Sequence, residues 1–160
     1  MDVPSTVYLC SGSGSHDTEV GSFEMALRDA GIECYNLSGV SSVVPPEAEI
    51  IDSGECRSDL GDNLDAGQVV NCVLSKKSTA NAKPISCSVA AVRGEKGHGY
   101  LIESQGRELQ SVKNKALSTA VDLLHSEAVE ERYVAERAIG NEDFCTTVVS
   151  VALLIDKKLR

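Results

Sequence analysis

Two spacings of apolar residues divide the chain into predicted helices and strands. Apolar side chains three or four residues apart indicate a helix, and short alternating or continuous apolar runs indicate strands. The helical spacing occurs twice, over about residues 18–30 and 108–126. Strands are predicted over residues 3–10, 32–38, 48–52, 68–75, 85–92, 99–104, 131–138 and 144–155.

Each predicted helix has one apolar face, and the segments between elements are polar. Gly31 is placed to end the first helix in the left-handed conformation. Loops are predicted over the glycine–serine segment 11–15, the aspartate-rich segment 53–66 and the polar segment 76–83. The apolar faces consist of Val20, Phe23, Leu27 and Ala30 in the first helix, and Val112, Ala116, Ala120, Leu123 and Leu124 in the second.

The order of these elements favours a layered fold of the α/β (α+β) class. Two mainly antiparallel sheets, with one helix on each outer face, would bury every apolar face named above. We therefore predict a four-layer α/β/β/α sandwich. The chain has 160 residues and no linker or low-complexity segment that would divide it, so residues 1–160 are predicted to form a single domain.

Composition excludes some classes of partner. The formal net charge is −9, whereas nucleic-acid binding needs clustered Lys and Arg to neutralise phosphates. The absence of Trp, with only two Phe and four Tyr, also argues against stacking on bases. No apolar run approaches 18 residues, and the N-terminus does not resemble a signal peptide. We expect no nucleic-acid partner, no membrane and a cytoplasmic location.

Cysteine and histidine spacing gives no sign of a metal site. The six cysteines, at positions 10, 34, 56, 72, 87 and 145, form no Cys-x-x-Cys pair and have no nearby histidine. Zinc sites usually need ligands paired at short spacing. Isolated cysteines in apolar strands are typically small buried residues with free thiols, which suits a reducing compartment. His16, His98 and His125 are likewise far apart in sequence.

The candidate chemistry lies at Ser41–Ser42, between a short apolar run and Pro45–Pro46. A rigidly held Ser-Ser bond can cleave itself. The Ser42 hydroxyl attacks the Ser41 carbonyl, the amide becomes an ester, and β-elimination followed by hydrolysis leaves a pyruvoyl group. Backbone strain of about 1–3 kcal/mol could drive this step, and Pro45–Pro46 is its expected source because proline restricts the chain on both sides.

Residues 31–51 resemble the self-processing segment of the pyruvoyl-dependent arginine decarboxylases. Asn36, the Ser41–Ser42 pair and the Pro-Pro-Glu-Ala-Glu run of residues 45–49 all occur at the family spacing. The order of elements also fits the family from residue 3 to residue 155. The resemblance therefore covers nearly the whole chain, and its most specific part is a block of about twenty residues.

This resemblance implies cleavage between Ser41 and Ser42, giving a β chain of residues 1–41 and an α chain of residues 42–160. The pyruvoyl group made from Ser42 would form a Schiff base with L-arginine and release CO2 and agmatine, a step of polyamine biosynthesis. No pyridoxal phosphate and no metal would be needed. The family also implies a homotrimer, or a dimer of trimers, with each active site between neighbouring subunits.

Three further residues match positions of the family. Asn36 is expected to share a strand face with Cys34 and Ser38 and to stabilise the oxyanion during cleavage. Glu103 is expected in an apolar strand on the side of Leu101, where burial favours the protonated carboxyl and suits a proton donor. Glu24, where the family has an acidic residue, is expected to pair with the substrate guanidinium.

Other functions remain open from the sequence. The same chemistry could act on another amino acid such as histidine, because the aspartate-rich region 55–65 departs from the apolar stretch of methanogen members. The chain could also be an uncleaved, silent scaffold or partner subunit, although the intact Ser41–Ser42, Asn36 and Glu103 argue against this. A nucleotide-binding module using the glycine–serine segment 11–15 is the least favoured, because no complete phosphate-loop motif is present.

Overall fold

The computed structural model describes residues 3–55, 60–157 and 159, which form two helices, two sheets and one short 3-10 turn. The helices are α1 (Glu19–Asp29) and α2 (Leu109–Asp122), and the 3-10 turn is Leu60–Asp62. The strands are β1 (Thr6–His16), β2 (Asn36–Gly39), β3 (Val43–Val44), β4 (Glu49–Asp52), β5 (Val69–Thr79), β6 (Pro84–Gly94), β7 (Gly99–Gly106), β8 (Ala128–Ile139) and β9 (Cys145–Ile155).

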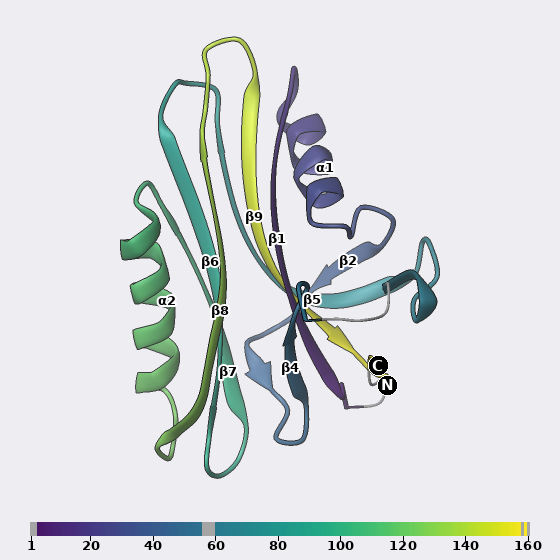
Figure 1. Cartoon of the computed structure of the whole chain (residues 1–160), viewed down its shortest axis with the longest axis vertical. Helices are drawn as coiled ribbons and strands as arrows, with labels where there is room; N and C mark the ends of the chain where they lie inside the picture. The colour runs from purple at the N-terminus through teal and green to yellow at the C-terminus, as the bar shows by residue number, and fades with distance from the viewer. Residues whose placement is uncertain (1–2, 56–59, 158, 160) are drawn as a thin grey trace.

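The elements form the predicted four layers, with a helix on the outer face of each sheet (Figure 1). The five-stranded sheet has the order β2-β5-β9-β1-β4 and the four-stranded sheet has the order β3-β7-β6-β8. The second sheet is antiparallel throughout, whereas β1–β4 and β2–β5 in the first sheet are parallel pairs. The predicted fold class is therefore confirmed.

Buried apolar residues fill all three spaces between the layers. Ala26 and Leu27 of α1, with Ala30 at its C-terminal cap, pack on the five-stranded sheet, and Ala116 and Ala120 of α2 pack on the four-stranded sheet. The sheets are joined by two groups of residues, which include Val7, Leu9, Val89, Leu101, Ala152, Cys87 and Val148. This inter-sheet layer matters for the site because the 40–44 segment crosses it.

The glycine–serine segment 11–15 is not a turn, and this prediction was wrong. Residues 11–15 continue β1, whose pairing with β9 extends to His16. Gly12 and Gly14 occur here because α1 crosses the strand closely: a Cβ atom at Gly14 would lie 2.5 Å from Ala26 N and from Met25 Cβ. The segment is covered by a helix backbone, so it offers no phosphate loop.

Other element boundaries also differ from the prediction. Residues 33–34 form a turn, and β2 begins only at Asn36, while Lys76–Thr79 extend β5 where a loop was predicted. Val20, placed on the apolar face of the first helix, is 74% exposed, and Leu123 is also exposed. Gly31 does end α1, with a φ angle of 75°. Part of the predicted loop 53–66, residues 56–59, lies outside the described residues.

Gly14→Ala is expected to destabilise the protein by about 1–3 kcal/mol, the usual cost of overpacking a close contact. The added methyl group would overlap Ala26 N and Met25 Cβ, so α1 must move away from β1. Urea unfolding measures the change. Gly39→Ala is the control, because a Cβ atom there meets nothing within 4 Å. Equal stability of the two variants would contradict the close packing of α1.

Candidate active site

The Ser41–Ser42 pair lies where the chain crosses from one sheet to the other. Val40 N–H donates to the Cys72 carbonyl of β5 at 3.0 Å, and Leu101 N–H of β7 donates to the Ser42 carbonyl at 2.9 Å. Val43 then pairs with Tyr100. The residue before the pair is thus fixed to the five-stranded sheet, and Ser42 itself is fixed to the four-stranded sheet.

The Ser41 carbonyl, which self-cleavage would attack, already accepts a hydrogen bond. Val43 N–H donates to it at 3.2 Å and closes a tight turn around Ser42. None of the described non-glycine residues has a positive φ angle. The segment therefore contains no left-handed residue, and the turn is held by hydrogen bonds to both sheets.

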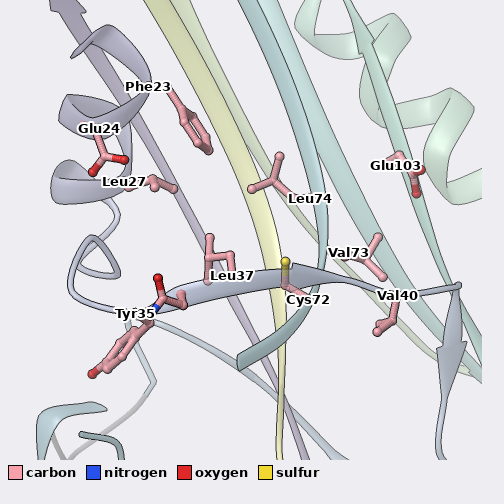
Figure 2. A pocket seen from close by; sticks show the side chains of 12 residues that line it. Phe23, Glu24, Leu27, Tyr35, Leu37, Val40, Cys72, Val73, Leu74 and Glu103 are labelled. Atoms are coloured by element: carbon pink, nitrogen blue, oxygen red, sulfur yellow. The ribbon is translucent and has the colours of Figure 1, made fainter. Parts of the chain in front are cut away.

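A pocket of about 550 Å³ opens beside this crossing (Figure 2). Gly39 and Val40, which lead directly into Ser41–Ser42, form part of its wall. Mostly apolar side chains from α1, β2 and β5 form most of the remainder. The lining consists of Phe23, Glu24, Leu27, Tyr35, Asn36, Leu37, Gly39, Val40, Cys72, Val73, Leu74 and Glu103.

The two predicted carboxylates both line this pocket, at opposite ends of the apolar wall (Figure 2). Glu24 projects from α1, and Glu103 projects from β7, two residues beyond Leu101. Both carboxylates are exposed in the single chain. The buried setting predicted for Glu103 was therefore wrong: β3 is only two residues long, so it leaves the β7 edge beyond Leu101 uncovered.

Asn36 lines the same pocket, but its side chain makes a contact that the sequence did not suggest. Its Nδ2 atom donates to the Gly67 carbonyl at 2.7 Å. The expected strand face shared with Cys34 and Ser38 was wrong in part, because Cys34 precedes β2. The group that contacts the Ser41 carbonyl is the Val43 amide, which no residue-type pattern could have indicated because every residue but proline carries an N–H.

Cys72 lines the pocket with a buried thiol. Burial raises the pKa of its thiol, so the reactive thiolate is disfavoured. Burial similarly raises the pKa of Cys10 to about 12. The prediction of buried cysteines is confirmed for Cys10, Cys72 and Cys87, but Cys34 is exposed and Cys145 is half-buried. Cys56 lies outside the described residues.

Histidines distant in sequence meet near the start of β7. The His98 and His125 ring centroids are 6.1 Å apart, and His98 Nε2 lies 3.2 Å from the Tyr100 hydroxyl.

Across residues 3–55, 60–157 and 159 no three metal-binding side chains come together. The described helices include none with the length and apolar character needed to span a bilayer.

Comparison with known proteins adds independent evidence. The chain matches the family model described as pyruvoyl-dependent arginine decarboxylase over residues 6–159. Pyruvoyl-dependent arginine decarboxylase 2 of Archaeoglobus fulgidus is 34% identical, with 96% of this chain and 98% of the relative aligned. The Methanocella arvoryzae pyruvoyl-dependent arginine decarboxylase is 35% identical, with 96% of each chain aligned. With this match across nearly its whole length, the chain belongs to the pyruvoyl-dependent arginine decarboxylase family.

Proposed function

We propose that this protein cleaves itself between Ser41 and Ser42 and then decarboxylates L-arginine to agmatine and CO2. The observation that carries the proposal is the position of the Ser41 carbonyl. It accepts a hydrogen bond from Val43 N–H, in a turn fixed to both sheets and adjoining a pocket that contains Glu24 and Glu103. The family membership supports the same activity.

Self-cleavage begins with addition of the Ser42 hydroxyl to the Ser41 carbonyl carbon. Negative charge develops on the Ser41 oxygen, where Val43 N–H is already placed to stabilise it. Asn36 begins β2 five residues before Ser41 and donates to the Gly67 carbonyl, so we assign the stabilisation of this oxygen to Val43 N–H. The bond from the Ser41 carbon to the Ser42 nitrogen then breaks, leaving an ester and a free amine.

The next steps release residues 1–41 as a separate chain. Loss of the Ser42 α-proton expels the Ser41 carboxylate and leaves a dehydroalanine at position 42. Water then replaces its nitrogen, which departs as ammonia, and position 42 becomes a pyruvoyl group. Throughout, Leu101 N–H can keep its hydrogen bond to the carbonyl of residue 42, because that carbonyl is unchanged by the reaction.

The pyruvoyl group supplies an electron sink for the α-carbon of a bound amino acid. The residues around it fit this chemistry, since β7 holds residue 42 through Leu101 and presents Glu103 two residues further along the same strand. We assign to Glu103 the proton that must return to the α-carbon after CO2 leaves. Its exposure in one chain is consistent with a neighbouring subunit covering this side of the pocket.

The two ends of the pocket suit arginine. The apolar side chains between them can pack against its three methylene groups, and Glu24 at the far end can accept a bidentate hydrogen bond from its guanidinium group. Histidine lacks the planar guanidinium fork that such a bidentate pair requires. We further propose a homotrimeric assembly in the cytoplasm, with sites between subunits. The exposed Val40 and Val43 beside the cleavage point support such a contact.

Mass spectrometry of the denatured, purified protein tests this proposal. We expect two fragments, residues 1–41 and residues 42–160, with the larger one carrying an N-terminal carbonyl that borohydride reduces. The cleaved protein should then release CO2 and agmatine from L-arginine and act on L-histidine at least about tenfold more slowly. A single uncut chain after long incubation would contradict self-cleavage, and a preference for histidine would contradict the role of Glu24.

A further inference from the structure

Arg93 of β6 contacts the segment that follows the proposed cleavage point. Its Nη1 atom donates to the Ala48 carbonyl at 2.6 Å and to the Pro46 carbonyl at 3.3 Å. These carbonyls belong to a turn closed by a 3.1 Å hydrogen bond from Ala48 N–H to the Pro45 carbonyl. The guanidinium group therefore holds a turn that begins three residues after Ser42.

The sheet directs Arg93 toward this turn. Val89 and Ala91, which precede Arg93 at alternate positions of β6, are buried between the two sheets. Arg93 continues this face at the end of the inter-sheet layer, where its side chain is 26% exposed. The pairing of β6 with β8 is interrupted by a register shift between Arg93 and Gly94. Such bulges re-aim a side chain and are frequent beside active sites.

A network of charged side chains holds the Arg93 guanidinium from its other side. Arg93 Nη2 pairs with Glu130 of β8. Glu130 also accepts a hydrogen bond from Arg132 Nε at 3.1 Å, and Arg132 Nη1 in turn donates to Glu55 at 2.6 Å. Glu55 follows β4 closely along the chain. Arg93 is thus oriented between β8 and the cleavage segment, and it does not simply project into solvent.

We propose that Arg93 is a positioning residue for self-cleavage, an inference that rests on the proposed function above. Val43 and Val44 lie between two fixed points, the Ser42–Leu101 hydrogen bond and the Arg93-bound turn. With both points in place, Val43 N–H stays on the Ser41 carbonyl. Without Arg93, the Pro46 and Ala48 carbonyls lose their shared donor and the turn can shift. A displacement of about 1 Å can slow a reaction about a hundredfold.

Cleavage and decarboxylation place different demands on Arg93. Once the link between residues 41 and 42 is broken, the Ser41 carbonyl has become a terminal carboxylate and is no longer attacked, so the geometry that Arg93 maintains is no longer required. Residue 42 keeps its hydrogen bond to Leu101. Loss of Arg93 should therefore slow cleavage while the cleaved fraction retains its activity per pyruvoyl group. A residue needed only for folding would not produce this division.

The test compares Arg93→Gln and Arg93→Lys with wild type and with Arg137→Gln. Arg137 is an exposed arginine of β8. Within the described residues, it makes no hydrogen bond to the 45–48 turn. The cleaved fraction is followed by mass spectrometry from the time of cell-free synthesis. We expect Arg93→Gln to cleave at least about tenfold more slowly and Arg93→Lys to be intermediate, because lysine lacks the planar guanidinium fork. Arg137→Gln should match wild type.

Melting temperature and kcat per pyruvoyl group complete the test. Wild-type cleavage rates in a folded Arg93→Gln protein would overturn the inference, and so would an equal slowing in Arg137→Gln. If Arg93→Gln does not fold, a folded Arg93→Lys that cleaves at the wild-type rate would overturn it instead. A wild-type protein that never cleaves would refute the proposed function, which is a different result from either of these.

Discussion

Ser42→Ala is expected to leave a single uncut chain with no decarboxylase activity. The substitution removes the only hydroxyl that can add to the Ser41 carbonyl from the following residue and, with it, the β-oxygen whose elimination would create the pyruvoyl group. The loss should be complete, because no other step of the proposed reaction can supply the carbonyl. Mass spectrometry and CO2 release from labelled arginine measure the two effects.

Ser41→Ala provides the matched control for this result. In the proposed reaction Ser41 contributes its main-chain carbonyl, and the Val43 N–H hydrogen bond to that oxygen does not involve the Ser41 side chain. We therefore expect Ser41→Ala to yield both fragments and an active enzyme. If cleavage fails in both variants, the Ser41 hydroxyl also takes part. If Ser42→Ala still cleaves, the assignment of the nucleophile is wrong.

Glu103→Gln is expected to cleave normally but to lose at least about a hundredfold in kcat. General acid catalysis by a positioned side chain contributes about 10²–10⁴-fold, and glutamine keeps the size of the side chain without its acidic proton. Among the described residues, the hydrogen bonds of the Ser41–Ser42 turn do not involve the Glu103 carboxylate, so self-cleavage should proceed. Single-turnover assays on the fully cleaved protein measure the loss. Retained activity would remove Glu103 from the mechanism.

Glu24→Gln is the counterpart at the other end of the pocket. Its carboxylate lies across the apolar wall from Glu103, so it can affect substrate binding without touching the reacting carbon (Figure 2). The expected result is a raised KM for arginine with kcat largely unchanged, because the interaction is equally present in substrate and transition state. If Glu24→Gln lowers kcat and Glu103→Gln raises KM, the two roles are reversed.

Backbone groups carry much of the chemistry proposed for the cleavage point. Val43 N–H donates to the Ser41 carbonyl, and Leu101 N–H holds the carbonyl of Ser42. Neither group depends on the side chain at its position, so substitution of Val43 or Leu101 would reveal it only indirectly. This explains why the side-chain candidates Asn36 and Glu103 were predicted while both amide donors were missed.

The sequence predicted best those elements in which apolar residues recur at a regular spacing. In α2, Val112, Ala116 and Ala120 repeat every four residues and are all buried. The glycine–serine segment of β1 was misjudged because Gly12 and Gly14 are typical of turns in isolation. Their presence in a strand is explained only by the closely packed α1 backbone. Val20 was wrongly assigned to the buried face of the first helix for a similar reason. Helical spacing shows which residues share a face, but it does not show how far along the helix the sheet covers that face.

By itself, the sequence determined the layered fold class, the family and the Ser41–Ser42 segment as the candidate cleavage point. These depend on local pattern and on residues close together in the chain. Only the tertiary structure decided which groups surround that point: the Val43 and Leu101 amides, Glu24 across the pocket, and the Arg93 contact with Pro46 and Ala48. The physical reason is that hydrogen bonds between strands, and the direction of each side chain, follow from register and from bulges. Those features are set by packing between segments far apart in sequence.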